Sequence, residues 1–166
     1  MKAEDLIKHF ELIPLAMEGG YYRETYRSTK HVSSEDSSPE FLKSFSTAIY
    51  YCLTASTFSH LHRLPTDEIY HFYYGDPVEL FLLIETPIPH FKLHVLGNNF
   101  LDGQVPQVTV PANVWQGSRL RKAGKVALMG TTMAPGFNFN DLELADYKTL
   151  KKLLPEADYW LKLLCK

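Results

Sequence analysis

The chain has 166 residues, 45% of them hydrophobic and 22% charged, which is enough to bury one core. The net charge of −2, with Lys and Arg scattered, argues against nucleic-acid binding, and no stretch reaches the roughly 20 apolar residues of a membrane span. The N-terminus carries acids and breaks its apolar run too soon for a signal peptide, and the two cysteines have no pairing framework. We therefore expect one cytoplasmic domain over residues 1–166, with no nucleic-acid or membrane partner.

The first predicted element is a short helix near residues 3–12, where apolar residues recur at helical spacing before Pro14. After a turn at Gly19-Gly20, residues 21–28 alternate as a strand. Residues 29–43 are polar and contain a Ser/Asp/Pro cluster, which predicts a surface loop.

Short runs rich in β-branched and aromatic residues then follow one another, separated by turn residues. They cover residues 45–54, 58–63, 68–75, 78–85, 91–97, 107–111, 114–120 and 125–133. This succession is typical of an all-β barrel or sandwich, and the turn residues favour antiparallel neighbours. Helical spacing returns near the C-terminus, where Pro155 predicts the start of a second short helix.

The densest group of chemically versatile side chains is SHLHRLPTDEIYHFYYGDP, residues 59–77. His60 and His62 are two residues apart, so both imidazoles would leave the same face of a strand. Glu68 begins the next predicted strand, and a hairpin would bring its carboxylate beside them. Two imidazoles and one carboxylate are donors that suit Fe, Mn, Ni or Zn. By the same alternation His71 would point away from this site.

This stretch resembles the first motif of the cupin family, a His-x-His pair followed by Glu and then Gly, although five residues separate His62 from Glu68. Residues 111–116, PANVWQ, resemble the second cupin motif. Asn113 stands where glycine is usual, and Gln116 stands where the last metal-binding histidine belongs.

The resemblance extends to the cupin branch known only as a domain of unknown function. It rests on residues 18–28, 46–54, 62–80, 110–120 and 134–145. This branch is similar in fold to the dTDP-sugar 3,5-epimerases, and it implies a double-stranded β-helix, or jelly-roll cupin barrel, paired as a homodimer. The aromatic residues on both faces of the strands also predict a second subunit. No single reaction is implied, because cupins include oxygenases, isomerases, decarboxylases and binding proteins.

Three hypotheses for function remain open. The first is a metal-independent isomerase or epimerase in which His62 is the base, Glu68 orients it and a tyrosine such as Tyr70 is the acid. The second is a divalent-metal enzyme, a dioxygenase or isomerase, that uses His60, His62 and Glu68 with Gln116 as a weak fourth ligand. The third is a ligand-binding module that does no chemistry.

The expected ligand is a small molecule, either sugar-like or anionic. Tyr70, Phe72 and Tyr74 share a predicted face and would line the barrel mouth, although core filling explains them nearly as well. Gln116 would contact the ligand from the second motif, and Arg23 would bind an anionic group. The sequence does not identify the substrate.

Overall fold

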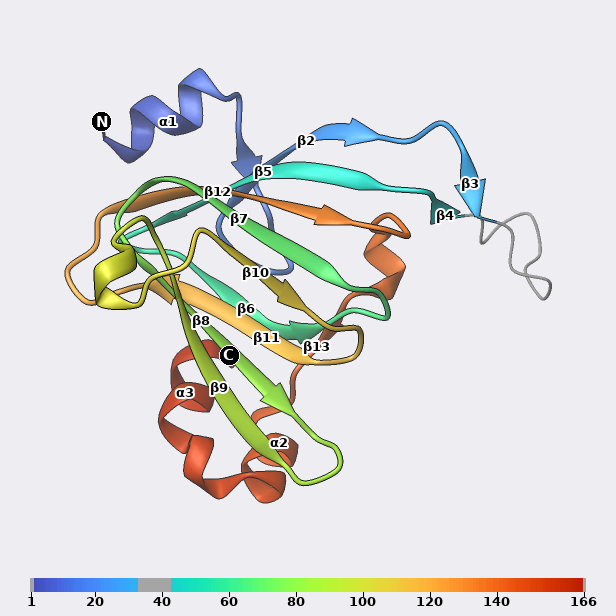
Figure 1. The fold of residues 1–166 in the computed structure, drawn as a ribbon, viewed down its shortest axis with the longest axis vertical. Helices are drawn as coiled ribbons and strands as arrows, with labels where there is room; N and C mark the ends of the chain where they lie inside the picture. The colour runs from blue at the N-terminus through green and yellow to red at the C-terminus, as the bar shows by residue number, and fades with distance from the viewer. Residues whose placement is uncertain (1, 33–42, 166) are drawn as a thin grey trace.

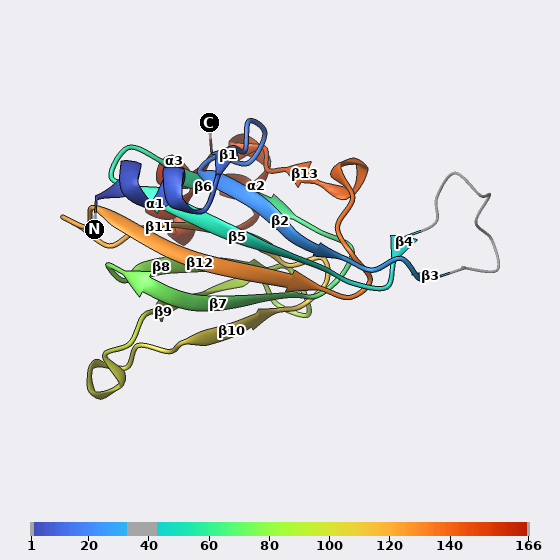
Figure 2. The ribbon, with the colours of Figure 1, turned by 90° about the horizontal axis from the view of Figure 1, so that it is seen from above.

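The computed structural model describes residues 2–32 and 43–165 of the chain. Two sheets face each other and enclose the core (Figures 1 and 2). The larger sheet has the order β1 (Ile13–Pro14), β2 (Tyr21–Arg27), β5 (Thr47–Thr54), β12 (Val126–Met133), β7 (Glu68–Gly75) and β10 (Gln107–Val110). The smaller sheet has the order β13 (Glu143–Leu144), β6 (Phe58–Arg63), β11 (Trp115–Leu120), β8 (Val78–Ile84) and β9 (His90–Leu96).

Successive strands from β5 to β8 lie alternately in the larger and the smaller sheet, and the ladders within both sheets are antiparallel. This is the arrangement of a jelly-roll barrel, so the predicted all-β fold is confirmed. The predicted hairpin between residues 58–63 and 68–75 is wrong, because β6 and β7 belong to different sheets. Glu68 nevertheless reaches the barrel interior, because the two sheets face each other.

The main core fills the space between the sheets and includes Tyr51, Tyr70 and Leu80. Helices cover the outer faces (Figure 1). On the smaller sheet, α2 (Tyr147–Leu153) and α3 (Asp158–Leu164) form a second apolar cluster with the outward side chains of β6, β8 and β11. On the larger sheet, α1 (Ala3–His9) buries Leu6 against Cys52. The α-helices of the described chain lie near its two ends. Each packs its apolar stripe on the outer face of a sheet, which buries that stripe.

The remaining elements are short. The 3₁₀ turns are η2 (Phe100–Asp102), η3 (Phe139–Asp141) and η4 (Pro155–Ala157), and η4 leads directly into α3. Within the predicted loop 29–43, β3 (His31–Val32) pairs with β4 (Lys43–Ser44), whereas residues 33–42 lie outside the described part of the chain. Among the described residues, no helix is long and apolar enough to cross a membrane.

Three register shifts decide which side chains face the barrel interior. They lie in β2 beside β5, in β6 beside β11 and in β7 beside β12. Each is a β-bulge, in which an extra residue on one strand stands opposite the partner strand and reverses the alternation beyond it. A residue beyond one of these bulges therefore faces the opposite side of the sheet from the side that simple alternation predicts.

Candidate functional site

A pocket of about 250 Å³ opens at the end of the barrel where β2 and β12 end and β5 and β7 begin. Most of its lining is apolar or aromatic, and its charged residues are Glu18, Glu24, Arg27 and Glu68. The full lining is Leu15, Glu18, Tyr22, Glu24, Arg27, Thr47, Ile49, Leu64, Glu68, Thr131, Met133, Phe137 and Phe139. Apolar walls with a few convergent polar groups are typical of a site for a small molecule.

Glu68 is the first residue of β7 and is buried where the larger sheet faces the pocket. Its Oε2 accepts a hydrogen bond of 2.8 Å from Nε2 of Gln116, which comes from β11 of the opposite sheet. Gln116 in turn stands opposite His62 in the ladder between β11 and β6. The first and second sequence motifs therefore meet inside the barrel through Glu68, Gln116 and His62.

His62 has no exposed surface and does not line the pocket. Its Nδ1 lies 2.7 Å from the carbonyl oxygen of His60. A carbonyl oxygen only accepts hydrogen bonds, so Nδ1 carries a hydrogen and Nε2 is the nitrogen that faces the site. Nε2 lies 4.0 Å from Oε2 of Glu18 and has no hydrogen-bond partner among the described residues. The imidazole is thus a buried neighbour of the pocket carboxylates.

Glu18 was not predicted as a site residue, yet it lines the pocket from the connection between β1 and β2. Its Oε1 accepts a 2.8 Å hydrogen bond from Oγ of Ser59, and its carbonyl accepts one of 2.7 Å from the amide of His60. The next residue, Gly19, has φ of +102°, and a Cβ there would lie 2.2 Å from the carbonyl oxygen of Phe58. Glycine therefore lets this connection lie against β6. The acid directly before a glycine pair was the only local signal.

The charge of Glu18 acts on the other pocket carboxyl group, Glu68. The pKa of Glu68 is raised to about 7, first by burial and then by the negative charge of Glu18. The charge of His62 and hydrogen bonds from Thr131 and Gln116 act in the opposite direction. Glu68 is consequently present in both its protonated and ionised forms near neutral pH.

The predicted aromatic wall is divided between the core and the surface. Tyr70 and Phe72 are buried in the main core and do not line the pocket. Burial, followed by the charges of Glu68 and Glu18, holds the pKa of Tyr70 well above its ordinary value, so its hydroxyl keeps its proton. Tyr74 lies beyond the bulge in β7, is 44% exposed and does not line the pocket.

The bulge in β6 separates the two histidines of the first motif. Ser118 pairs with Ser59 and Gln116 pairs with His62, so β6 has one more residue than β11 between these pairs. Residues three apart, Ser59 and His62, therefore share a face, and both are fully buried. The rule of alternate residues placed His60 with His62, and the extra residue cancels that rule.

His60 is half-buried, and its ring centroid lies 4.7 Å from that of Phe58, outside the pocket lining. The structure therefore brings together His62, Glu68 and Gln116 of the predicted metal-binding set and leaves His60 apart. No group of three or more His, Cys, Asp or Glu in the described ranges converges as a metal site would require. The arrangement consequently does not fit the metal centre that the first motif suggested, and no chemistry is assigned to a metal here.

His71 lies outside the pocket, in agreement with the alternation of β7 before its bulge. Its Nε2 lies 3.2 Å from Oγ1 of Thr132, and Gln107 donates to its Nδ1 over 3.1 Å. Burial lowers the pKa of His71, so the imidazole favours its neutral form. These contacts tie β7 to its neighbours β12 and β10.

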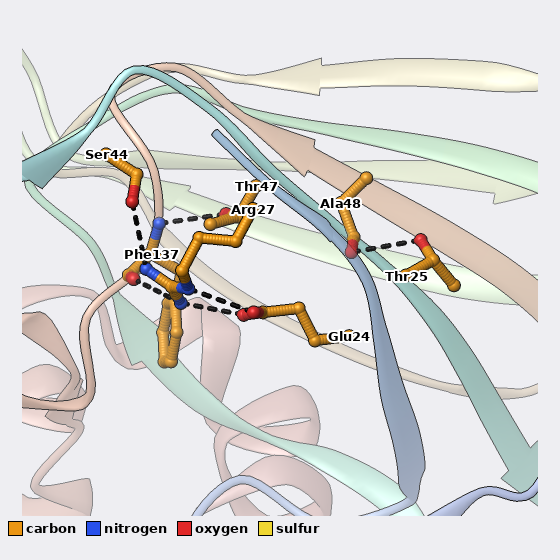
Figure 3. Close-up of polar contacts among 7 residues, drawn as sticks. All are labelled: Glu24, Thr25, Arg27, Ser44, Thr47, Ala48 and Phe137. Carbon is orange, nitrogen blue, oxygen red and sulfur yellow. Dashed lines mark hydrogen bonds and ion pairs between the residues drawn. The ribbon is translucent and has the colours of Figure 1, made fainter. Parts of the chain in front are cut away.

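The bulge in β2 places the two arginines of this strand on opposite faces. Arg23 pairs with Glu11 through a 2.9 Å ion pair outside the pocket lining. Beyond the extra residue, Thr25, the inner face passes to Arg27, which lines the pocket together with Glu24. Figure 3 shows the Thr25 hydroxyl donating to the backbone of β5 and Arg27 contacting Glu24. The arginine of this strand that lines the pocket is therefore Arg27, whereas Arg23, the arginine predicted to bind an anionic group, lies outside the lining.

Residues 4–145 match a family model described as Cupin superfamily (DUF985). A hypothetical protein from Leishmania major is 30% identical, with a TM-score of 0.89 and 99% of each chain covered. A protein from Shewanella oneidensis is 31% identical, with a TM-score of 0.85 over 100% of this chain and 98% of that one. A dTDP sugar isomerase from Desulfovibrio desulfuricans shares the fold at 15% identity and a TM-score of 0.53, over 81% of this chain and 87% of the other. No curated protein matches the chain.

Proposed function

The chain belongs to the cupin superfamily, in the branch described as DUF985, and on that premise we propose that it is a metal-independent acid–base enzyme of the isomerase or epimerase type. Its reaction would move a proton at a carbon next to a carbonyl group of a small molecule. The observation that carries the proposal is the pair of carboxyl groups, Glu18 and Glu68, in one pocket, with the pKa of Glu68 raised to about 7. A group that titrates near the working pH is suited both to accept and to return a proton.

Glu68 is the proposed catalytic base. In its ionised form it accepts the proton from the carbon, and the electron pair left on that carbon moves into the carbonyl group to form an enolate. In its protonated form it returns the proton to carbon, which forms the product and restores the ionised state of Glu68. The hydrogen bond of 2.8 Å from Gln116 to Oε2 holds the carboxyl group in a fixed position for this exchange.

Glu18 is the proposed partner that exchanges protons with the substrate oxygens. Its carboxylate takes the proton from the hydroxyl group next to the carbonyl and passes it to the carbonyl oxygen of the enolate, so it ends the step as a carboxylate again. Ser59, which donates to Glu18 over 2.8 Å, is a positioning residue for this carboxyl group. Proton transfer by two positioned groups is the usual means of lowering the barrier to enolate formation.

His62 takes a different part from the one the sequence suggested. Because it has no exposed surface and does not line the pocket, a substrate in the pocket would meet Glu18 and Glu68 first. Its effect is electrostatic: a positive charge on His62 lowers the pKa of Glu68, against the larger effects of burial and Glu18. We therefore assign the base to Glu68 and treat His62 as a residue that tunes it.

Deuterium exchange tests this proposal without knowledge of the substrate. The protein is incubated in D₂O with a set of simple aldoses, ketoses and their acids, and loss of the proton next to the carbonyl is followed by ¹H NMR. Wild type should exchange at least one compound, and Glu68→Gln should slow that exchange by about 100-fold or more. Glu11→Gln, a matched change at an exposed glutamate outside the pocket, should not alter it. Exchange that survives Glu68→Gln would refute Glu68 as the base, and exchange of no compound would favour the binding-module hypothesis instead.

A further inference from the structure

The charges around the pocket are unequal. Among the described residues, its lining contains three carboxylates, Glu18, Glu24 and Glu68, and a single cation, Arg27. Glu18 and Glu68 lie near the buried His62, whereas Arg27 is at the end of β2 with 44% of its side chain exposed. An anionic ligand would therefore depend on Arg27 for a favourable charge.

Arg27 is already engaged on both edges of its guanidinium group (Figure 3). Its Nε and Nη2 donate to the two carboxylate oxygens of Glu24 over 2.9 Å and 2.7 Å. Nη2 also donates to the carbonyl of Phe137 over 3.2 Å, and Nη1 donates to Oγ of Ser44 over 3.4 Å. A paired guanidinium edge is the geometry by which arginine binds carboxylates and phosphates. Glu24 thus occupies the place that an anionic ligand would need.

The rest of the lining suits hydroxyl groups. The carboxylates of Glu18 and Glu68 accept hydrogen bonds, and Thr47 and Thr131 add hydroxyl groups that donate or accept them. The remaining walls are aliphatic and aromatic, which is the surface that packs against the C–H faces of a sugar ring. A volume of about 250 Å³ is just below the usual range for ligand pockets, roughly 300–1,000 Å³, so it suits a monosaccharide better than a nucleotide sugar.

From these contacts we infer that the pocket selects an uncharged polyhydroxy carbonyl compound of about monosaccharide size, and that the Glu24–Arg27 pair excludes anions from it. The inference rests on the proposed function for the carbonyl group, whereas the exclusion of anions follows from the pocket charges alone. The ligand is thus the sugar-like member of the two classes expected from sequence, and Glu24 is the residue that determines the choice.

Inorganic phosphate at pH 8 and low salt is the probe for the exclusion, with binding measured by ³¹P NMR line broadening. Wild type should show no binding that depends on Arg27. Glu24→Gln keeps an acceptor for the guanidinium but removes the compensating charge, so phosphate affinity should rise by about tenfold or more. The double variant Glu24→Gln/Arg27→Gln should lose that gain. Circular dichroism of each variant verifies that the fold is retained.

The chain offers a matched control in the ion pair of Arg23, which is on the same strand as Arg27. Glu11→Gln removes the ion-pair partner of Arg23, and it should give no comparable gain because Arg23 does not line the pocket. Equal gains in the Glu11 and Glu24 variants would overturn the inference, as would phosphate binding to wild type that Arg27→Gln abolishes. In the exchange assay, neutral sugars should react and their phosphates and acids should not. Exchange confined to anionic compounds would refute the ligand class while leaving the proton-transfer proposal intact. If no compound exchanges but Glu24→Gln gains phosphate affinity, the proton-transfer proposal is refuted and the exclusion of anions by the Glu24–Arg27 pair is retained.

Discussion

Replacing Glu68 by Gln should make the protein more stable at pH 8 than wild type, while removing the proposed base. The pKa of Glu68 is about 7 in the folded chain, against 4.5 for an ordinary glutamate. The folded state therefore keeps a proton that the unfolded chain has already lost between these two values. Stability is lost as the pH rises through this window, and the full cost of about 3 kcal/mol is present above it.

Gln is uncharged at every pH and retains an oxygen that can accept the hydrogen bond from Gln116, which in wild type measures 2.8 Å. The free energy of unfolding of Glu68→Gln minus that of wild type should consequently increase by about 3 kcal/mol between pH 4.5 and pH 8. Urea unfolding at half-unit pH intervals measures this difference. Glu11→Gln, at an exposed ion pair, should stay within about 1 kcal/mol of wild type throughout. Parallel curves for wild type and Glu68→Gln would show that Glu68 is not the buried carboxyl group with the raised pKa.

Further predictions concern the residues around Glu68 and the assembly of the chain. Glu18→Gln removes the charge that helps to raise the pKa of Glu68, so the pH window in urea unfolding should move to lower pH; an unchanged window would argue against coupling of the two groups. Gln116→Leu removes a buried donor to Glu68 and should lower the free energy of unfolding by about 1–3 kcal/mol. If this loss disappears at low pH, the hydrogen bond acts on the ionised carboxylate. Gly19→Ala forces a Cβ toward the carbonyl of Phe58 and should lower the thermal midpoint, with a neutral effect contradicting the tight approach of this connection to β6. Sedimentation should give twice the monomer mass, since aromatic side chains of the larger sheet are exposed, and a monomer at micromolar concentration would contradict the predicted homodimer.

Much of the fold was predictable because it depends on local patterns. The predicted strands 58–63 and 68–75 match β6 and β7 at both ends, and the other long strands differ by one or two residues at their ends. Alternating apolar residues, β-branched side chains and turn residues are short-range signals, and each is sufficient to define a strand. The pairing of the strands is not local, which is why the hairpin expected between β6 and β7 is a crossing between sheets.

The sequence by itself determined that the chain forms a β-barrel and that His62, Glu68 and Gln116 meet inside it, because these residues belong to two motifs whose side chains were predicted to converge. Only the tertiary structure decided that Glu18 joins them and that Arg27, rather than Arg23, lines the pocket. Alternation is a count of residues, and each bulge adds one residue that the count does not contain. Glu18, moreover, acquires its influence on Glu68 only when two sheets bury both carboxyl groups in one space, since burial and charge proximity do not exist in an extended chain.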